Sequence, residues 1–314
     1  MKAIKPRDSV LGTLCAIGCE TLYGLSYIFT KQATGCSSEF ALLGWCFFIA
    51  ALAMSLCVWL SLIRIDLKGK PLRPLLLVAL CSPCVYFIAE TVGIRLTTAS
   101  ESGVLLACIP AASLIASALL LDEKPTRMQV AGILVTLAGV LVTVLAVSAA
   151  SSLSMPGYAF LLIAVVSYAL YSVFVSRAGG YTGAEITYVM LLIGAALFIL
   201  LAAAEAGLRG ELAALMLLPF RKPGFLAAVV YQGIGCSVFA FFLSNLAIAK
   251  IGVNHTSSFI GIATVVSILA GALLLREAFS AFQIIGAAVI IAGVYLANMT
   301  IPGTRSRTGK TGKA

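Results

Sequence analysis

The sequence has little charge and few of the side chains that catalysis and metal binding use most. Only 11% of its residues are Asp, Glu, Lys or Arg, and it has one histidine and two tryptophans. Soluble globular domains carry roughly a quarter of their residues as charged side chains. A single histidine argues against a zinc-type cluster, and no paired catalytic constellation is recognisable. The sequence therefore predicts no enzyme, no cofactor and no metal site.

Long apolar runs take the place of the missing charge. Apolar residues make up 61% of the 314 residues and gather in blocks separated by short polar joints. A helix needs roughly 20 apolar residues to cross about 30 Å of hydrocarbon, and lipid offers an open backbone no partners. We therefore predict an all-α membrane protein with ten transmembrane helices. Their ranges are 10–30, 39–62, 74–95, 100–121, 127–147, 156–177, 184–206, 224–248, 255–275 and 280–300.

Positive charge is unevenly distributed among the polar joints. Lys2, Lys5 and Arg7 precede the first apolar block, and both the joint after the second block and the C-terminal tail are rich in Lys and Arg. Cytoplasmic loops retain positive charge. We therefore expect a multi-pass protein of a bacterial inner-membrane type with both termini in the cytoplasm. The same rule explains the net charge of +9 without a nucleic-acid partner.

A weak internal duplication divides the chain. Residues 118–123 align with 272–277 and, without a gap, Gly132 aligns with Gly286 and Gly139 with Gly293, at a constant offset of 154 residues. Five helices is an odd number, so the second copy enters the membrane from the opposite side. Such 5+5 inverted repeats are typical of secondary transporters, with the site between the halves around a central cavity. The predicted units are an N-terminal tail (1–9), two five-helix repeats (10–148 and 156–300) and a basic tail (301–314).

Four short motifs strengthen this interpretation: Leu-Tyr-Gly-Leu-Ser-Tyr at 22–27, Gly-Ile-Arg-Leu-Thr-Thr-Ala-Ser at 93–100, Leu-Asp-Glu-Lys-Pro-Thr at 121–126 and Ala-Lys-Ile-Gly-Val-Asn at 249–254. They resemble those of the drug/metabolite transporter superfamily, and within it the EamA-like transporters. The resemblance covers roughly residues 10–300. It implies a basket-like bundle lined mainly by the first, third, fourth, sixth, eighth and ninth helices, and solute movement by alternating access without ATP hydrolysis. Tyr23 stands where family members often have Trp, and Glu20 is not part of the common pattern, so no named substrate is carried over.

The first predicted helix carries an unusual polar face. Glu20, Tyr23 and Tyr27 follow one another at helical spacing, so all three lie on the same side. A charged carboxylate at the bilayer centre costs about 2.5–3.5 kcal/mol on insertion scales and usually faces a cavity or a partner. Glu20 could hold a cationic or amine-bearing solute, or carry a proton. The alternative is a Glu that only ties helices together.

The third and fourth helices add two carboxylates and two prolines. Glu90 and Glu101 are candidates for substrate binding or proton coupling, although Glu101 could simply favour the dipole of the helix it begins. Pro83 and Pro110 each remove a hydrogen-bond donor and predict helix kinks whose freed carbonyls could line a cavity. Proline kinks are also ordinary features of membrane helices.

The second half offers a further set of polar candidates, namely Tyr168, Tyr171, Tyr231, Gln232, Asn254 and His255. The tyrosines could instead belong to the aromatic belt at the membrane surface. His255 aligns with Glu101 at the same offset of 154. As the only histidine it could respond to pH, or it could be a loop-end residue without such a task.

Together these features predict a secondary transporter for a small polar metabolite, an amino acid or an amine-type solute, with proton coupling as an option centred on Glu20. Uptake of a quaternary or polyamine cation is the alternative within the same class. A channel or an intramembrane enzyme would be alternatives of another class. The expected partners are the solute and the lipid bilayer, no nucleic acid is expected, and a homodimer is left open.

Overall fold

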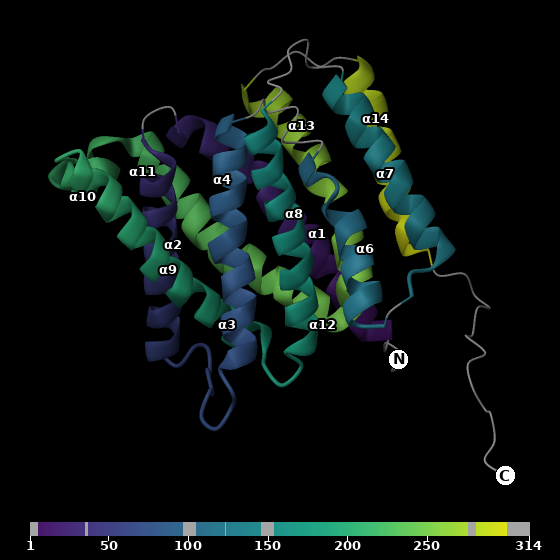
Figure 1. The fold of residues 1–314 in the computed structure, drawn as a ribbon, viewed down its shortest axis with the longest axis horizontal. Helices are drawn as coiled ribbons and strands as arrows, with labels where there is room; N and C mark the ends of the chain where they lie inside the picture. Colours follow the sequence, from purple (N-terminus) through teal and green to yellow (C-terminus); the bar gives the residue numbers. More distant parts are fainter. Residues whose placement is uncertain are drawn as a thin grey trace.

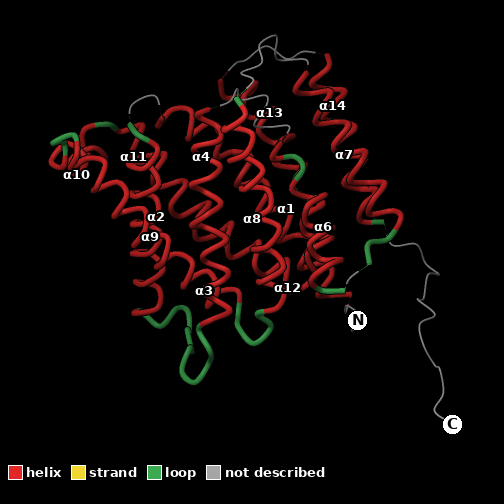
Figure 2. Tube along the Cα trace, viewed as in Figure 1, coloured by secondary structure: helices red, strands yellow, loops and turns green. Residues whose placement is uncertain are grey.

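The structure is a computed structural model that describes residues 6–34, 37–96, 105–122, 124–145, 154–275 and 281–299, and every regular element in these ranges is a helix (Figures 1 and 2). The first half contains α1 (Pro6–Thr34), α2 (Glu39–Trp59), α3 (Arg73–Ala79), the π-helical segment η1 (Leu80–Val85), α4 (Tyr86–Leu96), α6 (Ile109–Leu120) and α7 (Arg127–Leu145). The second half contains α8 (Met155–Arg177), α9 (Gly183–Leu208), α10 (Leu212–Arg221), α11 (Pro223–Val230), the π-helical segment η2 (Tyr231–Ala240), α12 (Phe241–Ser258), α13 (Gly261–Leu275) and α14 (Ala281–Asn298).

The predicted all-helical class is confirmed, whereas the count of ten spans stays a prediction. Six described helical stretches are long and apolar enough to cross a membrane: Asp8–Ser26, Glu39–Trp59, Arg73–Gly93, Met155–Arg177, Gly183–Leu208 and Pro223–Ser258. The last stretch runs through the predicted joint between the eighth and ninth helices. It is broken there at Gly252, whose φ of 81° and ψ of 170° are not helical. Short helices such as Ile109–Leu120 fall below the length of a span.

The start of several helices follows from local side-chain chemistry. Ser38 accepts a hydrogen bond from the Ala41 N–H at the start of α2, and Ser154 accepts one from Gly157 at the start of α8. Thr182 and Glu185 form a reciprocal capping box at the start of α9. Each cap provides an acceptor for N–H groups that the first helical turn leaves without a partner.

The two halves meet along several helices. α2 packs against α9, and α1 packs against α12, α13 and η2, so helices of one half contact helices of the other throughout the bundle. α7 and α14, the last helices of the two halves, form a pair at one edge of the molecule, and α10 lies at the opposite edge (Figure 1).

Glycines allow α7 and α14 to approach closely. A Cβ built on Gly132 would lie 2.6 Å from the carbonyl oxygen of Gly293, and one built on Gly139 would lie 2.9 Å from that of Gly286. The side chain of Thr136 donates a hydrogen bond to the Gly132 carbonyl at 3.0 Å. Small residues permit such contacts where lipid supplies no hydrophobic driving force.

The third helix of the first half is interrupted at the predicted proline. Ser82 has an extended backbone with φ −142° and ψ 124°, next to Pro83 within η1. The carbonyl of Cys81 accepts a hydrogen bond from the Ser167 hydroxyl of α8 at 2.9 Å. Pro110 differs from its predicted role, because it lies in the first turn of α6 and begins that helix instead of kinking it. Proline suits this position because the N–H groups there lack intrahelical acceptors.

The largest buried apolar cluster lies between α2, α3, α8 and α9. Phe47 and Phe198 are its largest fully buried members, and their ring centroids are 4.9 Å apart. Phe87 and Phe241 pack on Phe47 at 5.7 and 6.2 Å. Two polar residues pack on this aromatic layer: Tyr23 contacts Phe241, and Tyr86 contacts Phe87.

Candidate functional site

Glu20 lies within α1 with only 5% of its surface exposed. Among the described residues, its carboxyl group accepts one long hydrogen bond. The donor is the Cys19 thiol, whose Sγ lies 4.0 Å from Glu20 Oε1. The ion pairs among the described residues are Lys70–Glu185, Arg209–Glu205 and Lys250–Asp8, none of which includes Glu20. This carboxyl group therefore has no cationic partner among the described residues.

Two tyrosines of α8, in the other half of the chain, lie within electrostatic range of this carboxyl group. Glu20 lies close enough to Tyr168 and Tyr171 to act electrostatically on both hydroxyl groups. The two rings are 5.4 Å apart at an interplanar angle of 64°. Tyr23 lies one turn after Glu20, packs on Phe241 at 6.4 Å and interacts electrostatically with both α8 tyrosines. The structure therefore brings Glu20, Tyr23, Tyr168 and Tyr171 together.

A second carboxyl group joins the same set through Tyr86. The Tyr86 hydroxyl donates a hydrogen bond to Glu90 Oε1 at 2.8 Å, one turn away on α4. The Tyr86 ring also packs edge-on against Tyr168, with centroids 5.5 Å apart. We call these six residues the carboxylate–tyrosine cluster: Glu20, Tyr23, Tyr86, Glu90, Tyr168 and Tyr171. It draws on α1 and α4 of the first half and on α8 of the second.

A buried hydrogen-bond network fixes one side of the cluster. The Tyr171 hydroxyl donates to Asn245 Oδ1 at 2.8 Å, and the Asn245 amide donates to Thr187 Oγ1 at 2.9 Å. The Asn245 side chain is fully buried. Buried polar groups that are fully paired specify one arrangement of the surrounding helices. The network therefore holds the Tyr171 ring in place between α9 and α12.

Two other predicted site residues, Tyr231 and Asn254, form hydrogen bonds with neighbouring helices. The Tyr231 hydroxyl donates to the Leu22 carbonyl at 2.9 Å, and its ring stacks on Phe29 at 4.2 Å. Asn254 accepts a hydrogen bond from Ser117 of α6. Gln232 is half-buried in η2.

His255 connects three helices near the ends of α7 and α14. Its Nε2 lies 3.4 Å from Gln129 Nε2, and its Nδ1 lies 3.1 Å from Asn298 Oδ1. Glu101 lies outside the described residues, as does the side chain of Tyr27.

Sequence reasoning missed Tyr86 as a member of the cluster. Tyr86 precedes Glu90 by four residues, a spacing that places both on one helix face, so the signal was present. The contact with Tyr168 joins residues far apart in the chain and has no local signature. Asn245 is polar within an apolar run, which marks it as a candidate, but its link to Tyr171 also depends on tertiary packing.

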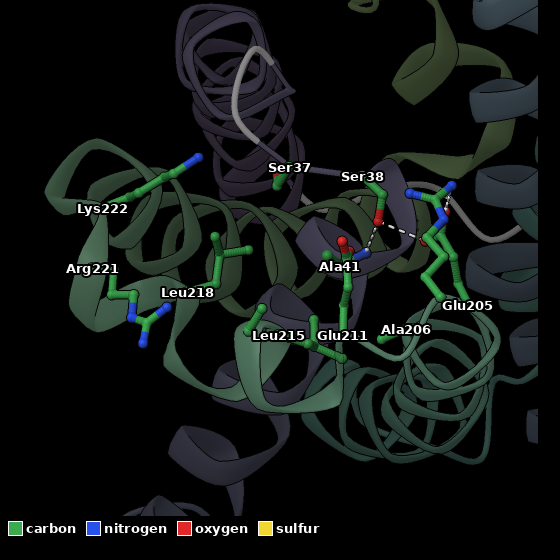
Figure 3. A pocket seen from close by; sticks show the side chains of 13 residues that line it. Ser37, Ser38, Ala41, Glu205, Ala206, Glu211, Leu215, Leu218, Arg221 and Lys222 are labelled. Atoms are coloured by element: carbon green, nitrogen blue, oxygen red, sulfur yellow. Dashed lines mark hydrogen bonds and ion pairs between the residues drawn. The ribbon is translucent and has the colours of Figure 1, made fainter.

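A cavity of about 300 Å³ lies elsewhere, at one end of the bundle (Figure 3). Residues of α2, α9 and α10 line it, including Ser38, Glu205, Leu215 and Arg221. The Ser38 hydroxyl donates to Glu205 Oε2 at 2.6 Å. This cavity is distinct from the carboxylate–tyrosine cluster, since none of the six cluster residues lines it.

Comparison with known proteins identifies the family. The family model of the EamA-like transporter family matches residues 10–145 and again residues 155–299. The chain belongs to the EamA-like transporter family. It is therefore a membrane transporter within the drug/metabolite transporter superfamily, and the two matches correspond to two copies of the family's repeat in one chain.

Relatives of this transporter cover nearly its whole length. The uncharacterized transporter YcxC of Bacillus subtilis (strain 168) is 29% identical over 302 residues, which is 96% of each chain. An uncharacterized transporter of Archaeoglobus fulgidus is 24% identical over 278 residues, covering 88% of this chain and 94% of that protein. A protein of known crystal structure shares the fold with a TM-score of 0.72 at 23% identity, over 91% of this chain and 96% of the other.

Proposed function

We propose that this protein is a secondary transporter that moves a small polar metabolite with an amine group, an amino acid or an amine, by alternating access and coupled to protons through Glu20. One observation carries the proposal. Glu20 of the first half is buried, and its carboxyl group lies within electrostatic range of Tyr168 and Tyr171 of the second half. Transporters built from inverted repeats bind their substrates between the halves, and this electrostatic interaction joins residues of the two halves.

The chemistry of the cluster favours a cationic group. A buried carboxylate needs a counter-charge or a proton, because taking an unpaired charge out of water is costly. An amine of the solute could supply the charge, and a proton on Glu20 could replace it when the solute has left. Glu90 is a second acceptor at the far side of Tyr86 and Tyr168. Exchange of a proton for an amine at Glu20 would couple the two movements.

A second candidate function is uptake of a quaternary or polyamine cation. It is favoured by the aromatic rings of Tyr86, Tyr168 and Tyr171, which pack edge-on at centroid distances of 5.5 and 5.4 Å. Tyrosine faces attract cations without needing a hydrogen bond, which suits a quaternary ammonium group. Substrate choice in the experiment below separates the two candidates.

The proposal includes ten membrane spans and both termini in the cytoplasm of a bacterial cell. Its support is the distribution of positive charge. The loop between α2 and α3 contains Arg64, Lys68 and Lys70, Arg73 begins α3, and Arg177 lies in the last turn of α8. Fewer are found at the other end of the bundle, where α9 and α10 end. Positive loops remain in the cytoplasm.

Transport by purified protein in proteoliposomes tests the proposal. Uptake of labelled amino acids, amines and quaternary cations is measured with and without an outward proton gradient, in which the vesicle lumen is acidic, for the wild type and for Glu20→Gln. Asp122→Asn is the matched control, because it also neutralises one carboxylate. Its residue has a φ of 55°, a conformation that asparagine tolerates well.

We expect saturable uptake of an amine-bearing solute that the gradient drives in the wild type and in Asp122→Asn. Glu20→Gln should lose the dependence on the gradient. Gradient-driven transport that survives Glu20→Gln would refute the coupling role of Glu20. Preference for quaternary cations without a gradient effect would select the second candidate, and flux that does not saturate would indicate a channel.

A further inference from the structure

The helix α10 exposes an apolar face where a water-facing loop helix would be polar. Leu212, Met216, Leu217 and Phe220 lie on one side of α10 and are exposed by 49%, 64%, 42% and 78%. The opposite side is packed on the bundle, where Leu215 and Leu218 are half-buried and Pro219 is buried. Exposed apolar patches of this kind mark a surface that contacts a membrane or a partner.

Native contacts hold α10 firmly in this orientation. The indole N–H of Trp45 in α2 donates a hydrogen bond to the Leu215 carbonyl at 3.0 Å. Leu218 packs on the cluster formed by residues of α1, α2 and α11, which includes Leu42 and Phe225. The apolar face of α10 is therefore directed outward by the fold.

Lipid-facing surface continues directly into α10. Leu200 and Leu208 of α9 are exposed by 68% and 92%, and Leu208 lies four residues before α10 begins. α9 is one of the helices that are long and apolar enough to cross a membrane. α10 follows the end of this span at the edge of the bundle (Figure 1). A span that ends with α9 at Leu208 would place the start of α10 at the depth where hydrocarbon gives way to headgroups.

Charged side chains line the cavity beside α10 on two sides, with Glu205 on one side and Arg221 and Lys222 on the other (Figure 3). Glu205 is already paired, because it accepts from the Ser38 hydroxyl at 2.6 Å and lies 2.9 Å from Arg209 Nη2. Arg221 and Lys222 lie on the other side of the cavity from Glu205 (Figure 3). The charged lining residues outside the Glu205–Arg209 pair are Arg221 and Lys222, with two positive charges, and Glu211, with one negative charge. The side near the end of α10 is therefore positive.

We propose that α10 lies in the membrane–water interface and that the cavity beside it binds the phosphate of an anionic phospholipid through Arg221 and Lys222. The acyl chains of the lipid would lie along the face that carries Met216 and Phe220. A helix with an exposed apolar face and cations near one end suits the membrane–water interface. Each Lys or Arg near an anionic surface contributes about 1 kcal/mol to the attraction.

Quenching of an introduced tryptophan by brominated lipids tests this site. Phe220→Trp protein is reconstituted into phosphatidylcholine that contains increasing fractions of phosphatidylglycerol, with bromine on the acyl chains of one lipid at a time. The wild type, with Trp45 and Trp59, provides the background signal. The relative affinity of the two lipids at the introduced indole follows from the two quenching curves. Arg221→Gln/Lys222→Gln is compared with Lys68→Gln, a control in the loop at the other end of the bundle.

We expect the introduced indole to be quenched and to prefer phosphatidylglycerol by about fivefold or more, which is the factor that one cation provides. The preference should vanish in the double variant and persist in Lys68→Gln. An indole that no brominated lipid quenches would overturn the placement of α10. Equal quenching by both lipids, or loss of the preference in inorganic phosphate at matched ionic strength, would overturn the anionic phospholipid site.

Discussion

Lys70 and Glu185 form the best-enclosed ion pair among the described residues, with Lys70 Nζ 2.8 Å from Glu185 Oε1 and 3.0 Å from Oε2. The same carboxylate accepts a hydrogen bond from the Asp66 backbone N–H at 3.1 Å. The Lys70 ammonium also lies 5.4 Å from the centroid of the Tyr181 ring. The loop between α2 and α3 is therefore fastened to the start of α9, a contact between the two halves of the protein.

Removal of the Glu185 carboxylate should release this loop. Hydrogen bonds to charged groups contribute about 1.5–3 kcal/mol each, so we expect limited trypsin cleavage after Arg64 or Lys68 to become about tenfold faster or more in Glu185→Ala. Asp8→Ala is the matched control, because it breaks the ion pair with Lys250, 2.7 Å long, at the same end of the bundle. Equal cleavage rates in Glu185→Ala and Asp8→Ala would show that the loop is held by other contacts.

A single methyl group at Gly293 should separate α7 from α14. A Cβ at this position would lie 2.4 Å from Thr136 Oγ1 and 2.5 Å from the Thr136 backbone nitrogen. Overpacking of this kind costs about 1–3 kcal/mol, so Gly293→Ala should lower the melting temperature measured in detergent by size-exclusion fluorescence. Gly207→Ala in α9 is the control, since nothing lies within 4 Å of the added Cβ. If both variants melt alike, the close approach of the two helices is unimportant for stability.

Tyr86→Phe should weaken solute binding without unfolding the protein. The substitution removes the hydroxyl that donates to Glu90 at 2.8 Å but keeps the ring that packs on Tyr168. We expect the transport KM to rise about tenfold, the effect of about 1.4 kcal/mol, with the melting temperature nearly unchanged. Tyr295→Phe, at a position of α14 with 70% exposure, should leave both quantities unchanged. A fall in melting temperature with an unaltered KM would assign Tyr86 to the framework alone.

His255→Gln should separate the two interpretations of the single histidine. Contacts with Gln129 and Asn298 indicate a residue that joins helix ends. We expect the variant to keep the pH profile of transport while losing about 1 kcal/mol of stability from one altered hydrogen bond. A displaced profile with unaltered stability would make His255 the pH-responsive group instead.

The all-helical class could be predicted from the sequence because the apolar runs are long and are separated by charged residues, Pro or Gly. The interruption at Pro83 and the joint near Gly252 follow from the backbone preferences of these two residues. α10 was not predicted. Its ten residues are too few for a span, and its apolar residues face both the bundle and the exterior.

The candidate site was predicted only in part, because its contacts join distant segments. Glu20 was recognised as polar within an apolar helix, and so were Tyr168 and Tyr171. Local spacing does not reveal that Tyr231 uses its hydroxyl on the Leu22 carbonyl, since that contact depends on how η2 packs on α1. Tertiary packing alone decides which polar groups face one another.

The contacts between α7 and α14 follow the rule of an isologous interface. Gly132 meets Gly293, and Gly139 meets Gly286, whereas the duplication pairs Gly132 with Gly286 and Gly139 with Gly293. Gly132 thus touches the duplicate of Gly139, and Gly139 touches the duplicate of Gly132. Such reciprocal contacts are expected where a two-fold axis relates two similar surfaces. The contact between α7 and α14 therefore has the pseudo-two-fold symmetry of a homodimer interface, although both of its surfaces belong to one chain.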